Sequence, residues 1–119
     1  SNHFVEKWPY MIIVKIILTV LPEKQLEFSQ TLFSMIELTR KETGCLNYNA
    51  TCDIEDNNRF NLLAEWETRE DLDNHIRSTR FGVLLGSKTL WREPMEIQIL
   101  TVFDSEGIAA VIYLREKSD

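Results

Sequence analysis

The fold is decided by residues 42–81, which read ETGCLNYNATCDIEDNNRFNLLAEWETREDLDNHIRSTRF. Apolar and polar side chains alternate over 45–53, the pattern of a strand with one buried face. The acidic and amide run at 55–58 has the composition of a hairpin loop, and 59–67 alternates again as the returning strand. A variant capping box then opens a predicted helix over about 68–79. This stretch therefore predicts a β-hairpin followed by a helix.

The sequence on either side completes a six-element pattern. Residues 11–21 are rich in β-branched side chains between two prolines and read as a first strand. Residues 22–41 have the apolar period of a helix. A further short helix or irregular apolar segment is expected over 81–91, and a fourth strand over 94–103. The order strand, helix, strand, strand, helix, strand predicts the split βαβ pattern of a ferredoxin-like α+β sandwich.

The predicted domain spans 11–103, with an N-terminal extension at 1–10 and a C-terminal extension at 104–119. Within the second extension, 108–114 is apolar at every position. A lone peripheral strand would not be apolar on both faces. We therefore expect this segment to be an extra strand, either added to the sheet or exchanged with a partner subunit.

The first strand is apolar on both of its faces. In a ferredoxin-like fold the helices cover only one face of the sheet, so the other face needs a partner. We expect a homodimer whose sheets face each other, a dimeric α+β barrel. The second face would carry Ile13, Ile17, Leu63, Leu100 and Val102.

Composition limits the classes of function. The chain has 119 residues and a net charge of −6, without the clustered Lys and Arg of a nucleic-acid or anionic-membrane surface. Its most apolar stretch, 11–21, is too short to span a bilayer and carries Lys15. In one extended strand Cys45 and Cys52 would lie roughly 23 Å apart, too far for a disulfide. Two free thiols favour a cytoplasmic location.

The stretch 42–81 resembles the antibiotic biosynthesis monooxygenase (ABM) family, and the resemblance extends over roughly 11–103. Members typically have Glu-Pro-Gly-Cys, then a Tyr-bearing strand, then Arg-Phe leading to Glu-Trp-Glu, and a helix ending in His. Here the corresponding residues are Glu42 to Cys45, Tyr48, Arg59-Phe60, Glu65 to Glu67 and His75. The resemblance implies a dimeric α+β barrel and a small cofactor-independent oxygenase of quinol-like or polyketide aromatics.

Two departures from the family pattern limit this expectation. Arg80 stands where the family has a second His, and a solvated surface Arg is the simpler reading of it. The first strand has no Asn, which the heme-degrading branch uses, so heme degradation is not expected.

His75, Trp66 and Tyr48 are the candidate catalytic residues. His75 falls on the helix face that Leu72 and Ile76 turn toward the sheet, and a neutral imidazole there could accept a phenolic or enolic proton. A core histidine bonded to a backbone carbonyl is the competing reading. Trp66 would form a flat wall and Tyr48 would donate its hydroxyl, although aromatic residues on a sheet face are most often core. Candidate substrate-lining residues, each of which could equally be ordinary packing, are Phe28, Phe33, Phe81, Leu85 and Trp91.

No metal-ligand spacing, phosphate loop or dinucleotide fingerprint occurs, so neither metal nor cofactor is expected. The first hypothesis is a cofactor-independent monooxygenase that takes a small aromatic and O₂. Two alternatives use the same cleft: a non-catalytic ligand-binding or stress-response domain, and an isomerase of small carbonyl compounds.

Overall fold

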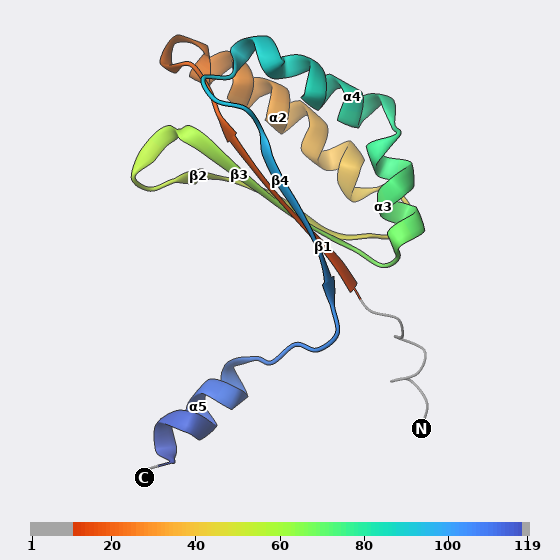
Figure 1. Cartoon of the computed structure of the whole chain (residues 1–119), viewed down its shortest axis with the longest axis vertical. Coiled ribbons are helices and arrows are strands. Elements are labelled where there is room, and N and C mark those ends of the chain that lie inside the picture. Colours follow the sequence, from red (N-terminus) through yellow and green to blue (C-terminus); the bar gives the residue numbers. More distant parts are fainter. Residues whose placement is uncertain (1–10, 118–119) are drawn as a thin grey trace.

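The computed structural model describes residues 11–117, so the predicted N-terminal extension, 1–10, lies outside the described residues. The chain forms a four-stranded sheet with helices packed on one face (Figure 1). In chain order the elements are β1 (Met11–Thr19), η1 (Pro22–Lys24), α2 (Gln25–Arg40), β2 (Cys45–Asp53), β3 (Asp56–Trp66), α3 (Arg69–Ile76), α4 (Thr79–Gly86), η2 (Ser87–Leu90), β4 (Glu96–Val102) and α5 (Ile108–Glu116).

The sheet has the strand order β2-β3-β1-β4, and each neighbouring pair is antiparallel. β1 lies inside the sheet, where Ile16 is opposite Leu62 of β3 on one side and Ile97 of β4 on the other. Sequentially distant strands are therefore neighbours, as the split βαβ pattern requires. The predicted ferredoxin-like α+β fold is confirmed.

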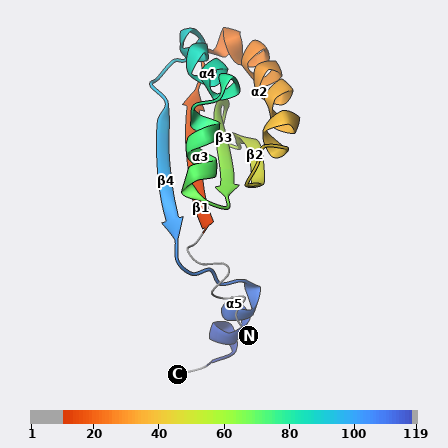
Figure 2. The same ribbon diagram turned by 90° about the vertical axis from the view of Figure 1, so that its right-hand side faces the viewer.

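The core lies between the sheet and the helices α2, α3 and α4. Alternate side chains of β1 and β3 point to this side, because successive residues of a strand face opposite ways. Figure 2 shows these helices in front of β1, β2 and β3, with β4 uncovered at the edge. No residue of β4 is buried. The buried apolar residues of the strands are Ile12, Val14, Ile16, Leu18, Tyr48, Phe60, Leu62, Ala64 and Trp66.

The helix predicted over 68–79 is in fact two helices. α3 begins as expected, because the Thr68 side chain accepts a hydrogen bond from the backbone N–H of Asp71. The side chain of Ser78 caps a new helix in the same way by accepting from the N–H of Phe81. Ser78 therefore ends one helix and starts the next, and α4 with η2 occupies most of the segment whose structure the sequence left open.

The predicted C-terminal extra strand is wrong, because Ile108–Glu116 forms the helix α5. The apolar run had suggested a strand buried on both faces. It instead forms a helix with apolar side chains on all sides, and every large apolar side chain of this helix is exposed. α5 extends away from the end of β4 toward the side of the sheet opposite the other helices (Figure 1). Neither α5 nor any other helix within 11–117 has the length and apolar content needed to span a bilayer.

The second face of the sheet is partly apolar and uncovered in the single chain. Leu63 and Leu100 are exposed on it, and Ile13 and Ile17 are half-buried. Polar side chains interrupt this surface: Lys15 lies across from Leu63, and Glu65 lies across from Ile13. The apolar face expected from the sequence is therefore present.

Candidate active site

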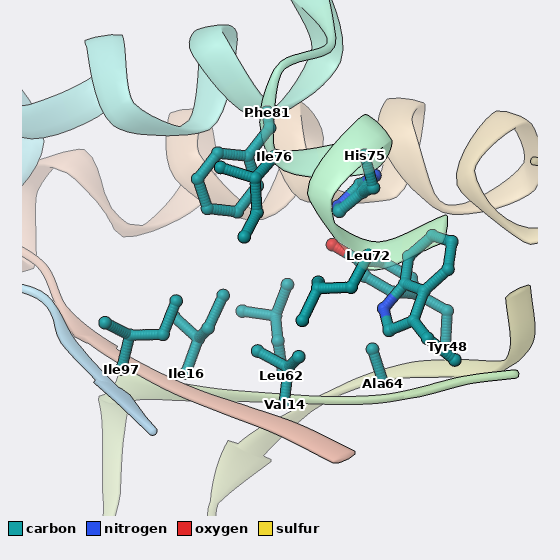
Figure 3. Close-up of a pocket in the computed structure, with 11 residues that line it drawn as sticks. Val14, Ile16, Tyr48, Leu62, Ala64, Leu72, His75, Ile76, Phe81 and Ile97 are labelled. Carbon is teal, nitrogen blue, oxygen red and sulfur yellow. The ribbon is translucent and has the colours of Figure 1, made fainter. Parts of the chain in front are cut away.

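A cavity lies between the sheet and the helices α3 and α4 (Figure 3). The volume open to the centre of a water-sized sphere is about 10 Å³. This is room for roughly one water molecule. Apart from three residues that carry polar groups, its lining is hydrocarbon. The lining residues are Val14, Ile16, Tyr48, Leu62, Ala64, Trp66, Leu72, His75, Ile76, Phe81 and Ile97.

His75 stands on α3, one turn after Leu72, and is only 5% exposed. Its ring stacks on Trp66 with the centroids 4.7 Å apart and the planes at 30°. Phe81 meets it edge-on at 5.4 Å. Aromatic groups therefore hold the imidazole on two sides at the cavity wall. The sequence prediction that His75 faces the sheet agrees with this placement.

Trp66 is fully buried at the end of β3 and lines the cavity. Its indole Nε1–H is buried and has no hydrogen-bond partner among the described residues. An unsatisfied buried donor costs about 1–3 kcal/mol, so such a group is worth an explanation. An oxygen atom of a ligand in the cavity would be a suitable acceptor.

Tyr48 reaches the cavity from β2, and its hydroxyl end points toward His75 (Figure 3). The two rings are 6.3 Å apart, with their planes at 68°. Burial, with smaller contributions from Cys45 and the Glu42 carboxylate, raises the pKa of Tyr48 to about 12. The phenol therefore stays protonated across the physiological range and can donate a hydrogen bond.

The structure adds a residue that the sequence reasoning missed. Oε1 of the Glu42 carboxylate lies 2.9 Å from Nδ1 of His75. Arg80 of α4 donates to Glu42 Oε2 from both Nε and Nη2, at 3.1 and 2.7 Å. Arg80 is thus engaged in an ion pair and is not the solvated side chain that the sequence suggested. The only signal for Glu42 in the sequence was its place at the head of the family-like Glu-Thr-Gly-Cys motif.

A tight turn brings Glu42 next to α3. The N–H of Glu42 donates to Thr39 O at the end of α2, and the N–H of Cys45 donates back to Glu42 O. Gly44 has φ +80°, and a Cβ atom there would overlap the Asp71 side chain. Only glycine accommodates both this conformation and this close approach. Gly44 therefore allows the turn to pack against α3.

The other four predicted lining residues do not reach the cavity. Phe28 is buried elsewhere in the core, with its ring 5.0 Å from Phe60. Phe33 is 80% exposed, because α2 turns Phe28 and Leu32 inward and the next residue points about 100° away. These findings correct the expectation for Phe28 and Phe33.

Leu85 and Trp91 also lie away from the cavity. Leu85 is exposed because Phe81 and Leu84 form the inward face of α4. The Trp91 indole Nε1–H donates to Ser87 Oγ at 3.0 Å, outside the cavity. Of the predicted lining residues, the structure therefore brings only Phe81 to His75, Trp66 and Tyr48.

No group of three or more His, Cys, Asp or Glu within residues 11–117 is arranged to hold a metal ion. The carboxylate beside His75 is already bound to Arg80.

Comparison with known proteins places the chain in a family. Residues 11–84, more than half of the chain, match the family described as antibiotic biosynthesis monooxygenase. The chain belongs to the ABM family. The matched residues include β1 to α3 and most of α4, and so all the cavity-lining residues except Ile97 of β4. The resemblance seen in the 42–81 motif is thereby confirmed.

Individual relatives agree with this assignment. An uncharacterised protein of Synechocystis is 30% identical over 90 residues, which are 75% of this chain and 61% of that protein. The chain thus spans less than two thirds of that relative. YcnE of Bacillus subtilis, described only as a candidate monooxygenase, is 26% identical over 88 residues, or 73% of this chain and 93% of YcnE.

Solved structures share the fold. A conserved protein from Methanosarcina mazei is 32% identical, with a TM-score of 0.74 over 82% of this chain and 97% of that one. A structure described as antibiotic biosynthesis monooxygenase is 24% identical, with a TM-score of 0.72 over 76% of this chain and 97% of that one. The second likeness concerns the fold alone.

Proposed function

We propose that this ABM protein is a cofactor-independent monooxygenase of a small quinol-like or polyketide-type aromatic. One observation carries the proposal: the imidazole of His75, the indole of Trp66 and the hydroxyl of Tyr48 meet at a cavity otherwise walled by hydrocarbon. A neutral imidazole can accept a proton from a substrate as a general base. An apolar cavity with a few convergent polar groups suits a planar aromatic ligand.

The proposed reaction needs no external reductant. His75 removes the phenolic or enolic proton of the aromatic, which in the keto tautomer is a proton of a ring CH₂ group, and the resulting delocalised anion gives one electron to O₂. The substrate radical and superoxide combine to form a C–O bond, and the peroxide takes the proton from the imidazolium. Loss of water then leaves one oxygen on the substrate as a carbonyl group. Oxidation of CH₂ to C=O supplies the four electrons that reduce O₂, so the reaction balances.

Trp66 and Tyr48 would hold the substrate oxygen while His75 acts. Both can donate a hydrogen bond: the indole Nε1–H has no partner among the described residues, and the raised pKa of Tyr48 keeps its phenol protonated. Two donors beside the same substrate oxygen would bind it and hold the substrate next to His75. Their placement in a hydrocarbon environment strengthens that interaction.

The cavity must widen to admit an aromatic ring. A cavity of roughly 150 Å³ accepts benzene, whereas the space for a water-sized sphere here is about 10 Å³. Ile97 of β4 lines the cavity and is 46% exposed, and none of the helices within 11–117 covers that edge of the sheet (Figure 2). We propose that substrate enters beside Ile97 through movement of α3 and α4 relative to β4.

We further propose that the working form is a homodimer joined through the uncovered face of the sheet. Leu63 and Leu100 expose apolar surface there that a second copy would cover. The same face carries Lys15 and Glu65, so a two-fold arrangement can place opposite charges against each other. α5 extends toward this side and could pack on the partner (Figure 1).

The test is oxygen consumption by the purified protein with a panel of quinols and reduced polyketide-type aromatics, in buffer treated with a chelator. The proposal predicts uptake of one O₂ for each substrate converted and one atom of ¹⁸O in the product when ¹⁸O₂ is supplied. Saturable binding of such compounds without oxygen uptake would instead indicate a non-catalytic binding domain. Conversion without oxygen uptake would indicate an isomerase.

A further inference from the structure

The structure places the carboxylate of Glu42 between two side chains that belong to different helices. Oε1 faces Nδ1 of His75 on α3, and Oε2 accepts both hydrogen bonds from Arg80 on α4. The side chains of His75, Glu42 and Arg80 are 6%, 17% and 30% exposed. The contact between His75 and Glu42 is therefore largely shielded from water.

We propose that Glu42 is the positioning residue that fixes the tautomer of His75. An ionised carboxylate can only accept hydrogen bonds, so the neutral imidazole must carry its proton on Nδ1 to bond with Oε1. Nε2 is then unprotonated and has a lone pair free to accept a proton. This inference rests on the proposed function for its catalytic meaning, because a general base needs this form of the ring.

Arg80 fixes Glu42 in turn. Its Nε and Nη2 both donate to Oε2, which leaves Oε1 for His75. Five positions separate His75 from Arg80, and the corner between α3 and α4 is held by Ser78, whose hydroxyl donates to His75 O at 2.6 Å. The same hydroxyl caps α4. The spacing of the two side chains that grip Glu42 is therefore set by a hydrogen-bonded corner.

The arrangement predicts an unusual result for Glu42→Gln. Arg80 presents only donors, so the amide oxygen of the new side chain would face Arg80. The amide NH₂ would then face His75 Nδ1, which could bond to it only as an acceptor. The imidazole proton would move to Nε2, and the ring would lose its free lone pair at that atom. The substitution changes one atom and nearly preserves the side-chain volume, yet it should invert the tautomer.

The experiment is ¹⁵N NMR of the His75 ring in the full chain, recorded at an alkaline pH where the ring ¹⁵N shifts no longer change as the pH is raised, so that the ring is neutral. The wild type should show a protonated Nδ1 and a bare Nε2, and Glu42→Gln should show the reverse. Glu37→Gln is the matched control, since it removes a carboxylate of α2 that is 77% exposed and that, among the described residues, pairs only with Arg40. The control should keep the wild-type tautomer.

Turnover provides the second readout. Glu42→Gln should lower kcat by roughly 10²–10⁴-fold, the usual contribution of a general base, with a much smaller change in KM. A wild-type spectrum with the proton on Nε2 would overturn the inference, and this result is decisive even if Glu42→Gln does not fold. An unchanged tautomer in a folded Glu42→Gln protein would also overturn it. If the tautomer inverts but the wild type consumes no oxygen, the proposed function fails and the role of Glu42 stands.

Discussion

The imidazole of His75 lies over the indole of Trp66, with the ring centroids 4.7 Å apart and the planes at 30°. A cation over an indole face is stabilised by the negative face of the ring, by up to about 2 kcal/mol when water is excluded. This stacking would favour the imidazolium that forms when His75 takes a proton from substrate. Trp66 therefore has three proposed roles: a wall for the substrate, a hydrogen-bond donor to the substrate oxygen and a support for the protonated base.

Trp66→Phe separates the wall from the hydrogen bond. The phenyl ring keeps an aromatic surface beside His75 but removes the buried Nε1–H that has no partner in the described structure. Loss of one neutral hydrogen bond of about 0.5–1.5 kcal/mol should weaken substrate affinity by roughly 2- to 10-fold. Steady-state kinetics should show this in KM more than in kcat. If kcat fell as far as in His75→Ala while KM stayed constant, the proposed substrate contact would be wrong.

Tyr48 makes the stability of the protein sensitive to alkaline pH. Burial raises the pKa of Tyr48 in the folded state to about 12, from 10.0 in the exposed phenol. As the pH rises, the unfolded chain therefore releases this proton before the folded protein does. The contribution of the protonated Tyr48 to the stability of the fold is complete below pH 10 and is lost as the pH rises toward 12. Two pKa units correspond to about 2–3 kcal/mol in the free energy of unfolding.

Urea unfolding of wild type and Tyr48→Phe across this range measures the effect. The wild type should lose stability relative to Tyr48→Phe between pH 10 and 12, because the phenyl ring cannot ionise. The difference between the two proteins isolates Tyr48 from every other group that titrates there. Parallel pH dependence of the two proteins would mean that the phenol is not buried as described.

Ile17→Asp tests the homodimer. Ile17 is half-buried on the uncovered face of the sheet, where a partner would seal it from water. The wild type should have twice the 14.0 kDa chain mass by light scattering at micromolar concentration, and Ile17→Asp should shift it toward the monomer. Phe33→Asp is the matched control, because Phe33 is 80% exposed on the helix side. A stable wild-type monomer would contradict the proposed homodimer.

α5 should be ordered only through contact with a partner subunit. It has nine residues, and isolated helices of this length are marginal in water. Ile108 and Leu114 also leave about seven tenths of their surface open in the single chain (71% and 68%). Hydrogen exchange should show protection across α5 in the wild-type dimer and its loss in Ile17→Asp. Fast exchange throughout 107–115 in an intact dimer would contradict this prediction.

The sequence predicts the sheet well because the sheet is built from local periodicity. Alternation along β1 and β3 puts Val14 and Leu62 on the face opposite Ile13 and Leu63, and the structure buries both. The same reasoning failed for α5, since a run that is apolar at every position contains neither the period of a strand nor that of a helix. Only the packing partner of such a run decides its conformation.

The sequence could predict those parts of the candidate site that depend on the periodicity of a single helix or strand. His75 lies on the same helix face as Leu72, and both line the cavity. Glu42 was not predictable in this way, because it is 33 positions from His75 and meets it only through a turn that Gly44 allows. The prediction for Phe33 failed because side chains five positions apart on a helix point about 140° apart, and Phe28 is the one that shares the inward face with Leu32.

His75→Ala tests the central claim most directly, because packing and catalysis give different results. Oxygen uptake and the melting temperature should be measured on the same preparations of wild type and variant. Turnover of an accepted quinol should fall by roughly 10²–10⁴-fold, while the folded fraction under assay conditions stays near that of the wild type. A variant that is destabilised by about 1–3 kcal/mol, yet consumes oxygen at the wild-type rate per folded molecule, would contradict the assignment of His75 as the base.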